Sequence, residues 1–256
     1  MDKIVKNITI GIRHKRTFKI RDHFGKFIDR ILHASDSPFS TTYFPFLDEK
    51  TSNSFTLHNK DNEYFQINAD DFVVSLKSTN NFQKDILHIK DTVLPFIKKR
   101  LFNITEISDI SRIGIIFSLE ITSKNELNKL ISFFTNSNIK STNDFDMRFS
   151  QKIPVSESLV KKNINDYINI IYSLVKDKNK LFINIDYQRY FEPELRDIND
   201  FDLNGFIESA TATLNNSYNN WLKNYEERKG SIDTQNSTKE SSKKTKKKAK
   251  EDSNKK

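Results

Sequence analysis

The stretch that decides the fold is Ser111-Arg-Ile-Gly-Ile-Ile-Phe-Ser-Leu-Glu-Ile-Thr122, near the middle of a 256-residue chain. Its apolar side chains occupy every second position: Ile113, Ile115, Phe117, Leu119 and Ile121. This spacing is typical of a strand with one buried face. A helical pattern follows directly, over Lys124–Thr135. The stretch therefore predicts a central strand followed by a helix.

The first half of the chain predicts another strand and helix, followed by a meander. Residues 4–19 alternate as a strand, and a helix opens at Arg21-Asp22. Four short alternating runs then predict antiparallel strands: Thr41–Phe46, Ser54–His58, Glu63–Ala69 and Asp71–Ser78. We interpret Asp70-Asp71 as a turn and not as paired catalytic carboxylates, because neighbours on a strand point to opposite faces. A long helix is expected over Phe82–Phe102, with a kink or break after Leu94 because Pro95 has no N–H.

The second half continues after the central strand and its helix. Asp144–Pro154 and Leu181–Tyr190 alternate as strands, whereas Ser158–Lys176 is amphipathic at helical spacing. The last element, Asp200–Arg228, predicts a long helix with acids at its start and basic residues at its end.

The order of elements predicts an α+β protein with a mostly antiparallel sheet, built as two packed sheet-and-helix halves; whether the halves share one continuous sheet stays open. We place the first sheet-and-helix half at residues 1–105 and the second at 106–229, ending in the long C-terminal helix. Aligning Ile10-Gly11-Ile12 with Ile113-Gly114-Ile115 brings the apolar positions of both strand–helix units into register, which suggests a pseudo-repeat. The alternative, that any strand–helix unit shows this pattern, stays open.

Residues 230–256 predict a disordered, Lys-rich tail, because they contain no apolar pattern. The net charge of the chain is +8, and the tail holds nine Lys against four acids, a net of +5. The body is therefore nearly balanced, and nonspecific nucleic-acid binding is expected through the tail. The tail lysines concerned are Lys243, Lys244, Lys246, Lys247, Lys248 and Lys250.

The composition argues against several classes of site. The chain has no Cys, so disulfides and thiolate zinc sites are excluded. Its five Gly form no dinucleotide-binding or P-loop motif, and no GxSxG or HExxH occurs, so we expect no cofactor and no metal. His14, His23 and His33 are interpreted as isolated histidines. With no apolar leader and no run long enough to span a bilayer, a cytoplasmic protein that does not bind a membrane is expected.

A few residues stand out as candidates for function. Asp186 lies inside an apolar strand pattern; it is either a structural or solvent-facing acid or a weak candidate for a catalytic carboxylate. Tyr187, Arg189 and Tyr190 offer either a base-stacking platform or packing beneath the last helix. Trp221, Leu222 and Tyr225 are expected to extend beyond the sheet and to contact a protein partner or a second copy.

Several of these segments together resemble a sporadically distributed family of conserved, uncharacterised prokaryotic proteins of roughly this length. The segments are Gly11-Ile-Arg, Tyr64-Phe-Gln-Ile-Asn, Phe72-Val-Val-Ser-Leu, Arg112-Ile-Gly-Ile and Ile183-Asn-Ile-Asp-Tyr, followed by the Trp-bearing helix. The resemblance implies no established activity, cofactor or catalytic residue. It implies a patchy distribution of the kind seen for mobile-element, toxin–antitoxin or phage-defence genes. We therefore expect a non-enzymatic interaction or accessory protein in such a setting; the alternative is a nucleic-acid-binding protein or an unfamiliar nuclease.

Overall fold

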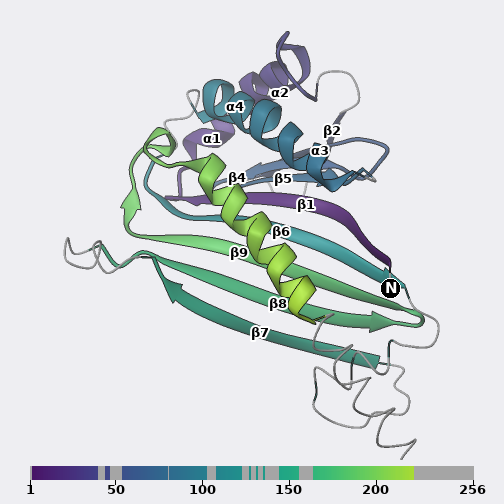
Figure 1. Ribbon diagram of the computed structural model, residues 1–256. Helices are drawn as coiled ribbons and strands as arrows, with labels where there is room; N and C mark the ends of the chain where they lie inside the picture. The colour runs from purple at the N-terminus through teal and green to yellow at the C-terminus, as the bar shows by residue number, and fades with distance from the viewer. Residues whose placement is uncertain are drawn as a thin grey trace, which may run out of the picture.

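The computed structural model shows one sheet of nine strands in the order β2-β3-β4-β5-β1-β6-β9-β8-β7 (Figure 1). Every neighbouring pair of strands is antiparallel. The strands are β1 (Asp2–His14), β2 (Phe44–Phe46), β3 (Ser54–His58), β4 (Tyr64–Asn68), β5 (Asp71–Lys77), β6 (Ile110–Thr122), β7 (Asp144–Pro154), β8 (Tyr167–Asp177) and β9 (Lys180–Leu195). The structure describes residues 2–39, 44–46, 54–79, 81–102, 108–122, 144–155 and 164–221, together with Leu127, Ile131 and Thr135. The expected α+β class and antiparallel sheet are confirmed.

The two halves of the chain meet at β1 and β6, which pair along most of their length. On one side of this seam, β5, β4, β3 and β2 follow β1; on the other, β9, β8 and β7 follow β6. In each half the first strand therefore pairs with the last strand. The strands that come between these two in the sequence lie further from the seam. One continuous sheet results.

The described helices cover a single face of this sheet (Figure 1). They are α1 (Lys19–Asp22), α2 (Phe24–His33), α3 (Phe82–His88), α4 (Leu94–Phe96) and a helix over residues 203–221. The alternation in the sequence explains the choice of face. Ile113, Ile115 and Phe117 of β6 are completely buried beneath the helices, and their cross-strand partners Ile12, Ile10 and Ile8 on β1 are buried with them. Each such side chain contributes about 1.5–3 kcal/mol on burial.

The sequence predicts a kink or a break after Leu94. The structure shows no break, because the helical run continues through Pro95 over residues 82–102. Two π-helical segments, η1 (Ile89–Val93) and η2 (Ile97–Phe102), lie on either side of α4. Because Pro95 cannot donate the usual backbone hydrogen bond, a wider π turn is a common way to keep such a helix continuous.

The helical interpretation of Ser158–Lys176 is wrong over its described part, because residues 167–177 form β8. The apolar side chains there fit a period of two as well as a helical period, and Ile170, Tyr172 and Leu174 are the buried ones. Ile and Tyr favour strands. Lys178, with a left-handed φ of 53°, then turns the chain directly into β9. Hairpin pairing with β9 therefore outweighs the amphipathic helical pattern.

The C-terminal helix begins at residue 203, three residues after the predicted start at Asp200. The carboxylate of Asp202 accepts a hydrogen bond from the backbone N–H of Gly205 at 3.0 Å and so caps its first turn. Ile207, Ala210 and Leu214 pack against the sheet. No helix in the described ranges has the length and apolar character needed to cross a membrane. Leu222, Tyr225 and the tail lysines lie outside the described residues.

The opposite face of the sheet carries the alternate side chains and is more polar. Thr9 and Ser75 hydrogen-bond across β1 and β5 at 2.8 Å, and Ser118 and Asn184 are opposite each other on β6 and β9. No helix in the described part of the chain lies on this side (Figure 1). We refer to it as the open face.

Candidate functional site

An aromatic pair stands on the open face where β8 and β9 run side by side. Tyr167 and Tyr190 are directly opposite each other in the register of these two strands. Their rings stack with centroids 4.6 Å apart and only 7° between their planes. Both side chains are half-buried, so each ring is held in place by the sheet while part of it still reaches solvent.

A cation lies at each end of this pair. The ammonium of Lys152 on β7 is 3.7 Å from the centroid of the Tyr167 ring. The guanidinium of Arg112 on β6 is 5.8 Å from the centroid of the Tyr190 ring. These four residues form an aromatic–cation row that crosses β7, β8, β9 and β6. Three strand spacings make the row about 14 Å long.

A chain of hydrogen bonds fixes the position of Tyr190 in this row. Arg112 donates to the Tyr190 hydroxyl at 3.4 Å, and that hydroxyl donates to Oε1 of Gln188 at 2.9 Å. Gln188 in turn donates through Nε2 to Oδ2 of Asp186 at 2.5 Å. Gln188 is buried, so its amide needs both contacts. Asp186 therefore positions the row through Gln188.

Asp186 itself lies on the open face of β9, opposite Ile116 of β6. Burial raises the pKa of its carboxyl above the usual range, while the Gln188 hydrogen bond and the charges of Arg112 and Arg148 act in the opposite direction. Among the described residues, Asp186 forms no ion pair. Asp186 is thus a half-buried, hydrogen-bonded acid on the open side of the strand and not part of an ion pair among the described residues, and the catalytic role stays untested.

The charge around the row is predominantly positive. Arg112, Arg148 and Lys152 have no carboxylate within ion-pair distance in the described part of the chain. Asp186, whose pKa is raised, and Glu192 are acids that act electrostatically on the groups of this face. The pKa of Tyr167 is also raised, chiefly by burial and in smaller part by Tyr190 and Glu192. Arg112 and Lys152, which form no ion pair with a described residue, flank the two stacked tyrosines. This arrangement suits an anionic ligand with flat, aromatic parts.

Of the three residues considered as a base-stacking platform, only Tyr190 faces this side. Tyr187 is buried on the helix-covered face, where its ring contacts Phe206 at 5.4 Å. Arg189 shares that face and forms an ion pair with Asp166 at 2.7 Å, with both side chains largely buried. For Tyr187 and Arg189 the packing interpretation is the one that the structure shows.

Trp221 packs on the same helix-covered face. Its ring makes an edge-to-face contact with Tyr172 of β8, with centroids 5.5 Å apart, and it adjoins the hydrophobic core. Trp221 is half-buried and lies over the sheet. A partner contact through Trp221, Leu222 and Tyr225 remains a prediction.

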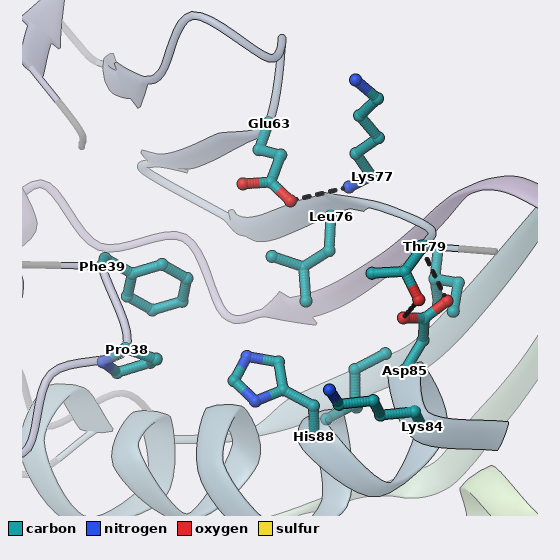
Figure 2. A pocket seen from close by; sticks show the side chains of 11 residues that line it. Pro38, Phe39, Glu63, Leu76, Lys77, Thr79, Lys84, Asp85 and His88 are labelled. Carbon is teal, nitrogen blue, oxygen red and sulfur yellow. Dashed lines mark hydrogen bonds between the residues drawn. The ribbon is translucent and has the colours of Figure 1, made fainter. Parts of the chain in front are cut away.

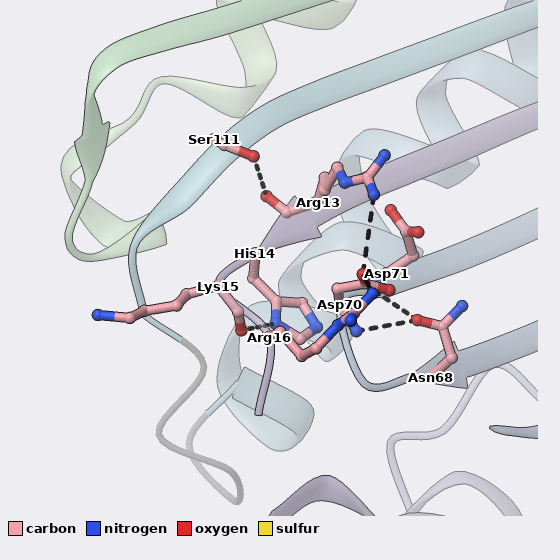
Figure 3. Close-up of polar contacts among 8 residues, drawn as sticks. All are labelled: Arg13, His14, Lys15, Arg16, Asn68, Asp70, Asp71 and Ser111. Carbon is pink, nitrogen blue, oxygen red and sulfur yellow. Dashed lines mark hydrogen bonds and ion pairs between the residues drawn. The ribbon is translucent and has the colours of Figure 1, made fainter. Parts of the chain in front are cut away.

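The acids at Asp70-Asp71 form part of the turn between β4 and β5 (Figure 3). The side-chain oxygen of Asn68 accepts hydrogen bonds from the backbone N–H groups of Asp70 and Asp71, at 3.0 and 2.7 Å. The Asp70 carboxylate also pairs with Arg16 at 2.9 Å and Arg13 at 3.7 Å. The turn interpretation is confirmed, and the Asp70 carboxylate is engaged in structural contacts.

The three histidines lie apart, on β1 and at the two ends of α2. His14 is buried; its Nδ1–H donates to the Lys15 carbonyl at 2.8 Å, and its Nε2 has no hydrogen-bond partner among the described residues. Within the part of the chain that the structure describes, no three His, Asp or Glu side chains are grouped closely enough to hold a metal ion.

A pocket of about 290 Å³ lies between the end of β5 and α3 (Figure 2). Its most buried acid, Asp85, already accepts hydrogen bonds from the side chains of Ser78 and Thr79, both at 2.6 Å, and from the Thr79 backbone N–H at 2.9 Å. Glu63 accepts one from the backbone N–H of Lys77 at 3.0 Å. These carboxylates therefore order the strand–helix connection and are poorly available to a ligand.

Comparison with known protein families and with curated proteins finds no match for this chain. The interpretation of the open face therefore depends on its own geometry.

Sequence reasoning missed three of the four residues in the aromatic–cation row. Lys152, Tyr167 and Arg112 are far apart in the chain and meet because β6, β9, β8 and β7 are neighbours in the sheet. Tyr167 lies in the segment Ser158–Lys176, whose spacing predicts an amphipathic helix. A strand interpretation of residues 167–177 would have placed it opposite Tyr190.

Proposed function

We propose that this protein is a binding protein that takes single-stranded nucleic acid on the open face of its sheet. The observation that carries the proposal is the row of Lys152, Tyr167, Tyr190 and Arg112, which crosses four strands on a face without a described helix. Sheets that bind single strands combine aromatic rings, on which two or three bases stack, with cations that meet the backbone phosphates. The row supplies both kinds of group in one line.

On each tyrosine ring, the free energy of stacking favours a nucleic-acid base over the cation that now lies there. An exposed cation–π contact contributes about 0.5–1 kcal/mol, whereas stacking of a base on an aromatic side chain contributes about 1–3 kcal/mol. A base can therefore displace Lys152 from Tyr167 or Arg112 from Tyr190. Both cations have long side chains, so a displaced cation can still reach the phosphate of the same nucleotide.

The tail adds a second, nonspecific contribution in this proposal. The lysines between residues 243 and 250 lie in a segment whose sequence contains no aromatic residue, so they are expected to attract any polyanion and to increase the salt dependence of binding. The open face supplies the preference for unpaired bases, because a duplex keeps its base faces covered.

We also infer that the two halves derive from one duplicated strand–helix–meander–helix unit. Each half places its first strand at the central seam beside its own last strand, and Gly11 is directly opposite Gly114 across that seam. These are the positions that the alignment of the two strands equates. The aromatic–cation row lies entirely in the second half. The parts of the open face that the two halves contribute are therefore proposed to differ in function.

The test is fluorescence anisotropy of a labelled oligothymidylate with full-length protein. We expect Tyr190→Ala and Tyr167→Ala each to weaken binding about 5- to 150-fold, the range that corresponds to one lost stacking contact. Arg112→Gln should lower affinity and reduce the salt slope by about 0.7. The matched control is Tyr64→Ala, which removes a tyrosine from the open face on β4, outside the row.

A full-length variant with the six tail lysines changed to Gln separates the two contributions. It should bind more weakly but keep the Tyr190→Ala effect and prefer single strands over duplex. If the Tyr167 and Tyr190 variants bind as the unaltered protein does, and only the tail variant loses affinity, the open face is not a nucleic-acid site. A protein ligand for that face then becomes the better interpretation.

A further inference from the structure

The outer strand β7 presents a long unpaired edge. It has 11 residues and pairs with β8 on one side only, whereas the strand at the other edge of the sheet, β2, has three. In the described part of the chain, nothing pairs with the outer side of β7. A long free edge offers a row of backbone N–H and C=O groups to any other strand, which proteins usually prevent or use.

The sequence of β7 is complementary to itself in the antiparallel direction. If two copies pair about Phe149, Asp146 of each copy is opposite Lys152 of the other, and Phe145 is opposite Ile153. The exposed fraction of Phe149 is 40%, and in this register it meets Phe149 of the second copy. Opposite charges and apolar pairs directly across a seam each stabilise it by about 0.2–1 kcal/mol.

Neighbouring registers are worse on two counts. Pairing about residue 148 places Arg148 opposite Arg148 of the second copy, and pairing about residue 150 places Arg148 opposite Lys152. Like charges in direct opposition destabilise a strand pair. Both registers also shorten the seam, to residues 144–152 and 146–154, whereas pairing about Phe149 uses the whole strand.

We propose that β7 pairs with β7 of a second copy of this chain, about a two-fold axis that is perpendicular to the sheet and lies midway between the two Phe149 residues. The helices of both copies then lie on the same side of one continuous sheet. The Phe149 ring is already held in place by stacking on Tyr172, with centroids 4.8 Å apart, so little side-chain entropy is lost on pairing. The two-fold arrangement closes the edge and stops further growth.

The seam is small, so the dimer is reversible. One strand from each copy buries less surface than an obligate interface, and the dimer should form progressively as protein concentration rises. Lys152 belongs to both the aromatic–cation row and this interface, but the strand pairing requires no nucleic acid and would stand if that proposal failed.

The test uses charge at the centre of the seam, with full-length protein followed by sedimentation velocity over a concentration series. Phe149→Lys and Phe149→Asp should each raise the dimer dissociation constant about tenfold or more, because each places two like charges in direct opposition. An equimolar mixture of the two variants should recover the dimer, because Lys and Asp are then opposite each other. The control is Phe18→Asp, which charges another exposed phenylalanine.

A second set of variants tests the register. Asp146→Lys and Lys152→Asp should each weaken the dimer, and the double variant should restore it. Circular dichroism and thermal unfolding confirm that each variant is folded. A monomer at every concentration of the unaltered protein would overturn the proposal, as would Phe149 variants that dimerise normally. Dimer loss in Trp221→Ala, with normal dimerisation of the Phe149 variants, would place the interface at the C-terminal helix and would also overturn it.

Discussion

Gly11 and Gly114 lie directly opposite each other where β1 pairs with β6, at the centre of the nine-stranded sheet. Neither places a side chain on the open face, so the sheet is shallow at this point. Their surroundings differ. A Cβ atom at Gly11 would meet only the Phe72 carbonyl oxygen at 4.0 Å, whereas one at Gly114 would lie 3.5 Å from Gln188 and 3.6 Å from Asp186.

This difference predicts opposite effects of the same substitution. Gly11→Val should raise the free energy of unfolding by about 0.5–1 kcal/mol, because Val favours strands and open space is available. Gly114→Val should lower it by about 1–3 kcal/mol, because the added methyl groups displace Gln188 and disturb the hydrogen bonds to Asp186 and Tyr190. Urea denaturation measures both. Equal effects would show that the hydrogen-bond chain tolerates displacement.

A second prediction concerns the pH dependence that Asp186 imposes. Its pKa is raised by burial above the usual value of about 3.8, so the folded state holds this proton more tightly than the unfolded state does. Stability from this group is therefore present at low pH and is lost as pH rises through the folded pKa. Asp186→Asn should match the unaltered protein near pH 4 and be at least as stable at pH 7. A variant that is less stable at pH 7 would show that the fold needs the charged carboxylate.

His14 should act in the opposite direction. Burial lowers its pKa below the usual value of about 6.5, although the Lys15 carbonyl and the charges of Asp71 and Asp70 oppose this shift. The unfolded chain therefore gains a proton that the buried ring resists, and stability falls as pH drops below about 6.5. His14→Gln should show a smaller loss of melting temperature between pH 7 and pH 5. His33→Gln, at the exposed end of α2, is the matched control.

The fourth prediction compares two residues of the C-terminal helix. Ile207 is almost fully buried, with an exposed fraction of 1%, so Ile207→Ala should cost about 2–5 kcal/mol of stability. Trp221 is half-buried against Tyr172, so Trp221→Ala should cost less than Ile207→Ala. As the only Trp in the chain, it also reports its own environment: its fluorescence should be partly accessible to a quencher in dilute protein. Complete protection, with an equal loss of stability, would place it in the core.

The strands of this protein were largely predictable because most of them carry one apolar face. Ser111–Thr122 alternates almost without interruption and forms β6, and Asp144–Pro154 matches β7 residue for residue. The prediction was wrong where the apolar pattern fits both the helical period and the strand period. The apolar residues of β8 suit a helix or a strand, and only pairing with β9 decides between them. That contact is not encoded in the local sequence.

The candidate site was harder to predict than the fold because its parts meet only through the order of strands. Asp186 and Tyr190 were singled out from one strand, but Lys152 and Arg112 have no local feature that connects them with that strand. The roles of Tyr187 and Arg189 also depend on which alternate residues of β9 point toward the helices. Alternate residues face opposite sides, so a platform of Tyr187 with Tyr190 could not form on one face.

The central position of β1 has a consequence during synthesis. Its partner β5 ends at Lys77, but its other partner, β6, ends at Thr122, 45 residues later. At about 5–20 residues per second, one edge of β1 stays unpaired for roughly 2 to 9 seconds after β5 has been made. The nascent first half therefore exposes an edge rich in Ile while the ribosome completes the strand that covers it, and this is the interval in which a chaperone would bind the chain.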